Sequence, residues 1–289
     1  MKNWLKLFAV LIPVAGSWSC NRDDTIIDVE PITPPEPVYE LVVYEYTPAP
    51  GQFINESTGD ISAEEAAEWA TERLKSESYV SLGAFGGYMI VGFGSPIGDF
   101  IIEGNAFTNA TGSSNEPGIV YVMQDINGNG LPDDIWYELR GSESDSATTI
   151  KDYAVTYYRP DAPGMSVKWK DNLGEEGEID YLASFHKQDY YYPSWIEEDS
   201  YTLRGTRLAD NSGRNEFGQW YTYPLEWGYV DNTGSNDNRF HISDAIKPDG
   251  SAANLSEIDF IKIQTAVCGK CGVLGEISTE VVSVRLVED

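Results

Sequence analysis

Residues 125–134 concentrate oxygen-bearing side chains of the kind that bind a hard cation. Carboxylates and amides alternate with Gly128 and Gly130, two residues that let the backbone curl around a central point. Calcium takes roughly six to eight oxygen ligands, and this spacing matches the first half of an EF-hand loop. The candidate ligands are Asp125, Asn127, Asn129, the Leu131 carbonyl, Asp133, Asp134 and Glu138.

The second half of the loop departs from the EF-hand pattern. Trp136 stands where an EF-hand has its bidentate glutamate. Asn-Gly sequences also favour tight turns without any metal. Apolar runs at residues 119–123 and 135–139 flank the loop and indicate the two strands of a hairpin. The segment therefore predicts a hairpin stapled by a structural calcium ion or, alternatively, an empty turn.

Aromatic residues are dense at residues 190–195 and 220–229, where acids and amides lie between them. Flat rings beside polar side chains bind sugar rings or a large planar ligand. The candidate ligand-binding residues are Tyr191, Tyr192, Trp195, Trp220 and Trp227. The alternative is that these side chains fill the core, because tyrosine and tryptophan are common in strands.

Nothing in the sequence forms a recognisable catalytic motif. Ser95 lacks the glycine two residues on that a nucleophile elbow needs, and His186 and His241 stand in no known arrangement. The 47 acidic residues make some close carboxylate pair inevitable, so a pair carries no weight by itself. We therefore expect no enzymatic activity, with a hydrolase that uses paired carboxylates as the alternative.

Two cysteines, Cys268 and Cys271, form a Cys-Gly-Lys-Cys sequence near the C-terminus. They cannot complete a four-ligand zinc site without the two histidines, which lie far apart in the sequence. In an exported protein the pair predicts a local disulfide across a turn, or two free thiols.

The first 37 residues carry the signals of export. Residues 1–19 combine Lys2 and Lys6 with an apolar run and predict a signal peptide. Cys20 follows small residues as in a relaxed lipobox and is the predicted site of lipidation. Residues 20–37 are rich in proline, threonine and acids and predict a flexible tether.

Residues 38–289 show no internal linker and predict a single domain. A helix is expected at residues 63–75, because Ser62 and Glu65 form a capping box. Elsewhere short apolar runs alternate with glycine, proline, asparagine and aspartate, which predicts strands. The main ones are residues 38–46, 79–82, 88–93, 100–104, 119–123, 135–139, 153–158, 165–169, 258–264 and 279–287. This pattern indicates an all-β fold, a jelly-roll-like β-sandwich with one N-terminal helix.

Several segments resemble a family of secreted cell-surface proteins of Bacteroidetes, some described as PKD-like. The similar segments are residues 46–55, 81–93, 99–107, 116–118 with the Asp125 loop, and 274–280, which together span the mature chain. The resemblance implies a lipoprotein on the extracellular face of the outer membrane. It also implies a place beside TonB-dependent uptake systems, including those for corrinoids.

These features predict a non-catalytic lipoprotein that binds a glycan or a corrinoid for a TonB-dependent outer-membrane transporter. An adhesive surface or matrix protein is a further alternative. Removal of residues 1–19 takes away two lysines and no acids, which changes the formal net charge from −28 to −30. Such a charge disfavours nucleic acid as a partner. Contact with the membrane is expected through the lipid alone.

Overall fold

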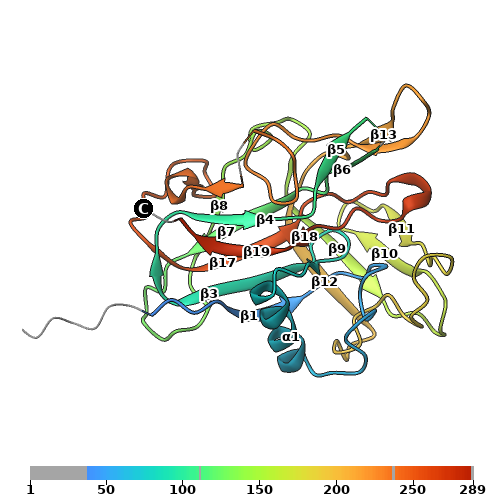
Figure 1. Cartoon of the computed structure of the whole chain (residues 1–289), viewed down its shortest axis with the longest axis horizontal. Helices are drawn as coiled ribbons and strands as arrows, with labels where there is room; N and C mark the ends of the chain where they lie inside the picture. The colour runs from blue at the N-terminus through green and yellow to red at the C-terminus, as the bar shows by residue number, and fades with distance from the viewer. Residues whose placement is uncertain (1–37, 111, 236–237, 288–289) are drawn as a thin grey trace, which may run out of the picture. The chain divides into compact units, whose positions relative to one another are not determined.

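The computed structural model describes residues 38–110, 112–235 and 238–287, all of which belong to one compact unit. The predicted signal peptide, the predicted lipidation site Cys20 and the predicted tether all lie outside the described residues. Where the chain is described, its strands pair in antiparallel fashion in every sheet (Figure 1).

A six-stranded antiparallel sheet forms the centre of the unit. Its strands are rich in β-branched residues, whose side chains pack well on a pleated surface. In spatial order they are β1 (Val42–Thr47), β3 (Tyr88–Ile97), β17 (Ile258–Thr265), β7 (Gly118–Met123), β8 (Trp136–Leu139) and β16 (Ala245–Ile246).

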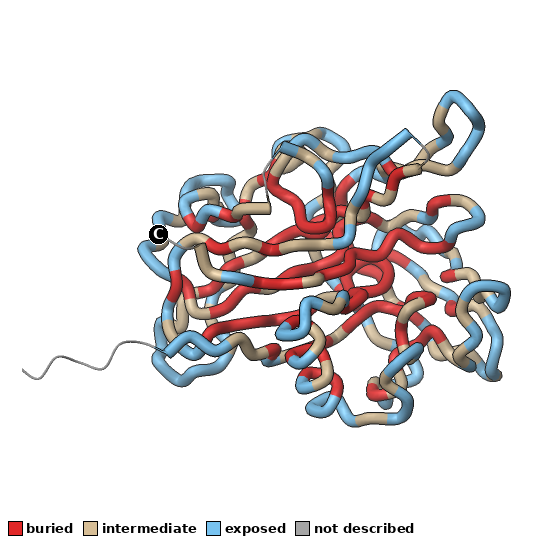
Figure 2. Tube along the Cα trace, in the orientation of Figure 1, coloured by how far each residue is buried: buried red, intermediate tan, exposed pale blue. Residues whose placement is uncertain are grey.

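A second layer covers one face of this sheet. It consists of a three-stranded sheet, in the order β15 (Arg239–Phe240), β4 (Phe100–Glu103) and β19 (Ser283–Leu286), together with the helix α1 (Ala63–Lys75). The largest hydrophobic core lies between the two layers and takes apolar side chains from both of them. Figure 2 shows the central strands as buried and the connecting loops as exposed.

The helix α1 forms where its cap and composition predict it. Ser62 Oγ accepts a hydrogen bond from the Glu65 amide at 3.2 Å, and a Glu65 carboxylate oxygen accepts one from the Ser62 amide at 2.7 Å. The small buried face of the helix, which includes Ala66 and Ala70, lets it lie close to β1. Thr71 Oγ1 accepts a hydrogen bond from the Val43 amide at 2.9 Å. The helix therefore provides an acceptor for a backbone amide on this edge strand.

A four-stranded sheet encloses a second hydrophobic core. Its order is β11 (Glu176–Ile179), β10 (Val167–Asp171), β9 (Ile150–Tyr158) and β12 (Ser200–Arg207). Large side chains such as Tyr153, Tyr157 and Phe85 fill this core. Tyr157 donates a hydrogen bond to the Phe85 carbonyl at 2.8 Å, which ties the sheet to the turn before β3.

Shorter elements complete the unit. Three two-stranded pairs are β18 (Glu280–Val281) with β2 (Val80–Ser81), β13 (Ser212–Arg214) with β14 (Trp220–Thr222), and β5 (Phe107–Asn109) with β6 (Gly112–Ser114). Two single-turn 3-10 helices are η1 (Ile242–Asp244) and η2 (Gly272–Leu274).

The turn before β3 depends on glycine. Gly83 has a φ of 68°, and a Cβ atom there would lie 2.0 Å from the Ala49 carbonyl oxygen. Only glycine fits such a left-handed position against another backbone segment. The close approach of Gly83 to Ala49 holds the segment that follows β1 against the turn that precedes β3.

The structure confirms the predicted fold class. The described residues form an all-β, sandwich-like fold of several antiparallel sheets with one α-helix, and α1 has the predicted bounds. The Asp125 hairpin is confirmed as well, since β7 and β8 pair in antiparallel fashion on either side of the loop.

Candidate functional site

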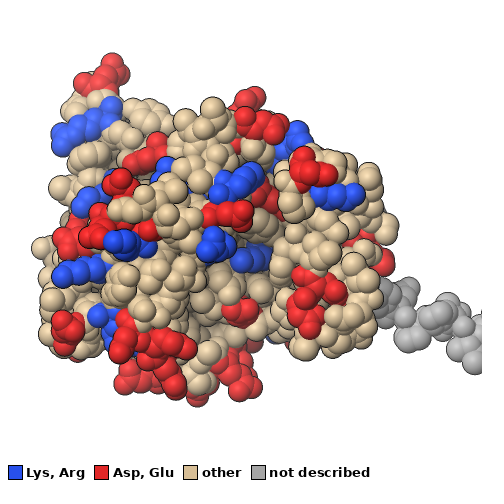
Figure 3. Space-filling model, turned by 180° about the vertical axis from the view of Figure 1, so that it is seen from behind, with Lys and Arg blue, Asp and Glu red and all other residues tan. Residues whose placement is uncertain are grey.

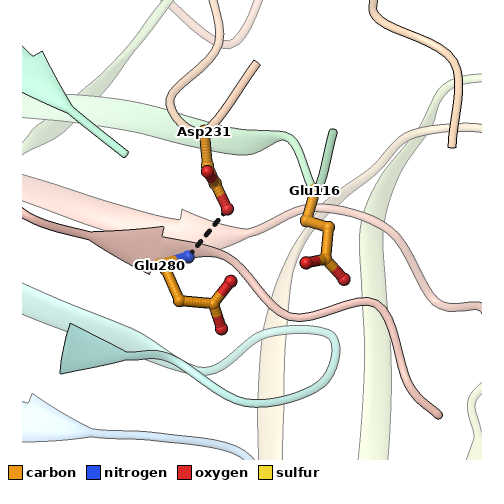
Figure 4. Close-up of side chains that lie close together, drawn as sticks. All are labelled: Glu116, Asp231 and Glu280. Atoms are coloured by element: carbon orange, nitrogen blue, oxygen red, sulfur yellow. Dashed lines mark hydrogen bonds between the residues drawn. The ribbon is translucent and has the colours of Figure 1, made fainter. Parts of the chain in front are cut away.

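Three carboxyl groups from distant parts of the sequence converge in the interior. Glu116 precedes β7, Asp231 follows a bridge between Val230 and Gly118, and Glu280 begins β18. One oxygen of each lies within 4.8 Å of the others. Figure 4 shows the three side chains pointing toward a common space. We call these three residues the carboxylate cluster.

Backbone contacts hold the three segments of the cluster together. The Glu116 amide donates a hydrogen bond to the Asp231 carbonyl at 2.9 Å, and the Glu280 amide donates one to Asp231 Oδ2 at 3.0 Å. Asp231 adopts a φ of 57°, which is uncommon for a residue other than glycine. The hydrogen bonds to the Asp231 carbonyl and to Asp231 Oδ2 hold the residue in this left-handed conformation and so fix the direction of its carboxylate.

Ser278 connects two members of the cluster. Its amide donates to Glu116 Oε1 at 3.1 Å, and its hydroxyl donates to a Glu280 oxygen at 2.5 Å. Ser114 Oγ donates to the second oxygen of Glu116 at 3.0 Å. Within the described ranges, no lysine, arginine or histidine forms an ion pair with any of the three carboxylates.

Burial dominates the electrostatics of the cluster. It raises the pKa of Glu116 to about 7, although hydrogen bonds from Ser278 and Ser114 act in the opposite direction. Burial, and next the charge of Glu116, raise the pKa of Asp231 and of Glu280 well above their ordinary values. Three negative charges are therefore not stable here without a compensating proton or cation.

A pocket of about 280 Å³ adjoins the cluster. Glu116 and Glu276 both line it, with aromatic rings that include Phe53, Phe107 and Phe185. Glu276 Oε1 accepts a hydrogen bond from the Gln52 amide at 2.6 Å, whereas Oε2 is buried and has no hydrogen-bond partner among the described residues. Burial raises the pKa of Glu276 to about 7.

A larger groove of about 610 Å³ lies on the face of the six-stranded sheet that points away from α1. The sheet contributes aromatic and polar side chains, β12 contributes one wall, and the loop after β16 contributes another. Among its lining residues are Tyr121, Trp136, Glu138, Arg204, Lys262 and Gln264. We call it the outer-face groove.

Lys262 lies in this groove on β17, mostly buried. Its Nζ atom is 4.1 Å from the centroid of the Tyr88 ring and 5.7 Å from that of Tyr121. Burial lowers the pKa of Lys262 to about 8, and the charge of Glu45 opposes this effect. A lysine held by aromatic rings is a candidate contact for a ligand in the groove.

The structure places most of the predicted calcium ligands together in the exposed Asp125 loop. The two Asp125 oxygens accept hydrogen bonds from the amides of Gly128, Asn129 and Gly130 at 2.7–3.2 Å. The side-chain amides of Asn127 and Asn129 both donate to Asp133 at 3.0 Å. The Ile126 and Asn127 amides donate to Asp134 Oδ2, and the Leu131 carbonyl accepts from the Asp133 amide. Calcium at this loop stays a prediction.

Glu138 does not belong to the Asp125 loop. Its carboxylate lies 2.7 Å from Lys151 Nζ and accepts a hydrogen bond from Thr206 Oγ1 at 2.6 Å. Because β8 carries Glu138 away from the loop and into the outer-face groove, its prediction as a calcium ligand was wrong.

Three of the five predicted ligand-binding aromatics are core residues. Tyr191 and Tyr192 are 0% and 1% exposed, and Trp195 is 9% exposed. Trp195 Nε1 donates to the Tyr46 carbonyl at 3.3 Å, so it covers the edge of β1. The predictions for Tyr191 and Tyr192 were wrong, because both side chains fill the second core. Trp195 belongs to the largest core and also lines a recess of about 740 Å³ beside β1 and α1, so its role as a ligand contact stays a prediction.

The other two aromatics are partly exposed but lie outside the outer-face groove. Trp220, on β14, stacks under the Arg214 guanidinium, 4.6 Å from the ring centroid. Trp227 lines a separate recess of about 330 Å³ together with Arg140 and His241. The aromatic-rich segments therefore do not form one binding surface.

Cys268 and Cys271 are both free in the structure, so the disulfide predicted between them does not form there. Their side chains have different surroundings. Cys268 Sγ accepts a hydrogen bond from the Tyr153 hydroxyl at 3.6 Å, and Cys271 lines the pocket next to Glu276. Two free thiols were the alternative prediction.

The carboxylate cluster was missed in the sequence. Its members are separated by long stretches of chain, so their convergence depends on tertiary pairing. One signal was available, since Glu280 stands next to the apolar run that forms the closing strands. An acid at the start of a buried strand indicates a buried carboxyl group that needs a partner.

No protein-family model matches the chain, and a search of curated proteins finds no significant match. None of the described helices is long and apolar enough to cross a membrane.

Proposed function

We propose that this chain is a lipoprotein of the outer cell surface that binds an extracellular nutrient, a glycan or a corrinoid, for uptake by a TonB-dependent transporter. The role is binding without catalysis. The observation that carries the proposal is the outer-face groove, which combines aromatic and polar side chains in one recess of about 610 Å³. Ligand sites commonly have volumes of roughly 300–1,000 Å³.

The chemistry of the groove suits a sugar ring. Trp136 and Tyr121 offer flat apolar surfaces, against which the faces of a pyranose can lie. Arg204, Lys151 and Glu138 offer donors and acceptors for hydroxyl groups. The ligand-binding residues are thus proposed on the central sheet, in place of the aromatic segments at residues 190–195 and 220–229.

A calcium ion in the Asp125 loop would support this arrangement. The loop connects β7 to β8, and these two strands carry Tyr121 and Trp136. An ion that stiffened the loop would therefore fix the positions of these two side chains in the groove. This role remains structural and needs no open coordination position.

A carbohydrate-active hydrolase is a second candidate, favoured by the pocket that Glu116 and Glu276 share with aromatic rings. Glycosidases divide their two carboxyl groups into a protonated acid and an ionised partner by pushing their pKa values apart. Here burial raises the pKa of both to about 7. Neither carboxyl group has a cationic partner among the described residues that would keep it ionised, so binding is the better-supported function.

Titration calorimetry of the mature protein against a panel of glycans and cobalamin tests the proposal. We expect at least one member to bind, and Trp136→Ala to weaken its binding by about tenfold or more because a stacking surface is lost. Phe217→Ala is the matched control, since Phe217 is 72% exposed in a distant loop. Absence of binding across the whole panel would contradict the proposal, and so would equal loss in both variants.

A further inference from the structure

The carboxylate cluster has more negative groups than the protein neutralises. Glu280 and Asp231 are 2% and 1% exposed, and Glu116 reaches them from the adjoining pocket. None of the ion pairs in the described part of the chain involves these three side chains. Buried carboxylates without a cationic partner commonly coordinate a metal ion.

We propose that Glu116, Asp231 and Glu280 bind a divalent cation of the calcium type, at a site separate from the Asp125 loop. Calcium–oxygen distances are about 2.3–2.6 Å, so two ligands on opposite sides of the ion lie roughly 5 Å apart. The three oxygens of the cluster lie within 4.8 Å of one another and fit around one such ion. Figure 4 shows the carboxyl groups directed toward the space between them.

A fourth carboxyl group supplies an independent sign of a missing ligand. Glu276 is 5% exposed, and its Oε2 atom has no hydrogen-bond partner among the described residues. It lines the same pocket as Glu116, outside the cluster itself. A buried carboxylate oxygen without a donor is costly, and a hydrated cation beside Glu116 would supply water molecules as donors.

The pocket also provides a route for the ion. Its volume of about 280 Å³ leaves room for the water molecules that complete a calcium coordination sphere. Ser114 and Ser278 already orient the Glu116 oxygens through hydrogen bonds of 3.0 and 3.1 Å. Such outer contacts fix the direction of ligands around a metal.

The donor set favours a hard cation. All three members of the cluster offer carboxylate oxygens, which suit calcium, magnesium or manganese better than zinc or copper. His186 is engaged by Glu56 at 2.8 Å. The Cys271 thiol lines the pocket, but a soft sulfur ligand suits zinc or copper better than a hard cation. Calcium fits best because it tolerates irregular geometry.

Bound calcium, counted on the mature protein by equilibrium dialysis, tests the site. We expect Glu280→Gln and Asp231→Asn each to bind one ion fewer per chain than the parent protein. Asp161→Asn is the matched control, because it removes one exposed carboxylate that lies outside both candidate calcium sites. It is expected to bind as many ions as the parent protein.

Thermal unfolding gives a second readout that does not depend on the stoichiometry. At a calcium concentration about 100 times the Kd, the midpoint of the parent should rise by about 5–10 °C over its value with a chelator. Glu116→Gln, the least buried change in the cluster, should lose most of this shift if the more buried variants do not fold. A parent that binds no ion at millimolar calcium would overturn the proposal. In that case protons shared between the three carboxyl groups would neutralise the cluster instead of a cation. Variants of the cluster that bind as many ions as the parent would also overturn the proposal.

Discussion

At the residue scale, Lys262 shows how a charge can be kept inside a β-sheet without a carboxylate partner. Its ammonium group contacts the faces of Tyr88 and Tyr121, and no salt bridge to it occurs among the described residues. Ring contacts of this kind stabilise a cation by about 0.5–2 kcal/mol. They do not offset the full cost of burial, since the pKa of Lys262 falls from 10.5 to about 8.

Lys262→Met should therefore stabilise the protein at neutral pH. The folded protein binds the proton of Lys262 more weakly than the unfolded chain does, so the cost of the charge is fully present below about pH 8. It disappears as the pH rises from about 8 to 10.5. After allowance for the lost ring contacts, we expect a gain of about 1–2 kcal/mol in the free energy of unfolding at pH 7.

Urea denaturation of the variant and the parent at pH 7 and pH 10 measures this difference. The gain should shrink at pH 10. Lys168→Met, on the exposed side of β10, is the control and should change stability by less than about 0.5 kcal/mol at either pH. A variant less stable than its parent at pH 7 would show that the ammonium is net favourable.

The two thiols near the C-terminus should be reduced and slow to react. Burial raises the pKa of Cys268, and that of Cys271 to about 11, so little thiolate is present at neutral pH. A thiol reagent should detect both groups after denaturation and modify them slowly in the native protein at pH 7.5. An intact mass about 2 Da lower in protein purified without reductant would instead identify a disulfide.

At the element scale, the cap of α1 is a local feature with a measurable effect. Ser62→Ala removes the side-chain acceptor for the Glu65 amide, and an N-cap of this kind contributes about 1 kcal/mol. We expect that loss in the free energy of unfolding, measured by urea denaturation. Ser57→Ala is the matched control, because Ser57 is exposed and its side chain forms no hydrogen bond with any described residue. Equal stability of the two variants would indicate that packing alone positions the helix.

The elements could be predicted from the sequence because their signals are local. The capping box predicted the start of α1, and the helix-forming residues after it predicted its length. The alternation of β-branched residues predicted β3, β9 and β17 to within a few residues. β11 was not predicted, because Glu176–Ile179 is mostly polar and forms a strand only by pairing with β10. Short polar strands depend on their neighbours more than on their own composition.

The candidate site was predicted less well because it depends on tertiary contacts. Glu116, Asp231 and Glu280 meet only after β7 and β18 have found their places in different sheets. The aromatic residues were misplaced for a related reason. Tyrosine and tryptophan occur both at binding surfaces and in β-cores, and only burial separates the two cases, as Tyr191 and Trp136 show.

At the scale of the whole molecule, the distribution of charge bears on the proposed attachment of the protein to a membrane. Lysine and arginine side chains mix with acidic ones across the middle of one face, whereas acidic groups dominate at its lower edge (Figure 3). The net formal charge of −28 makes electrostatic attraction to an anionic lipid surface unfavourable. We therefore expect stable attachment, if the protein is held at a membrane, to depend on the predicted lipid on Cys20.

Cys20→Ala tests this dependence on the lipid. We expect the variant to lose incorporation of labelled palmitate and to leave the membrane fraction almost completely, because neither charge nor a described helix offers another anchor. Cys268→Ala is the control and should remain attached, since its thiol lies inside the folded unit beside Tyr153. Protease treatment of intact cells should degrade the parent, as expected of an extracellular face. A Cys20→Ala chain that stayed with the membranes would require a binding partner there, which would move the origin of surface attachment from the lipid to the folded unit.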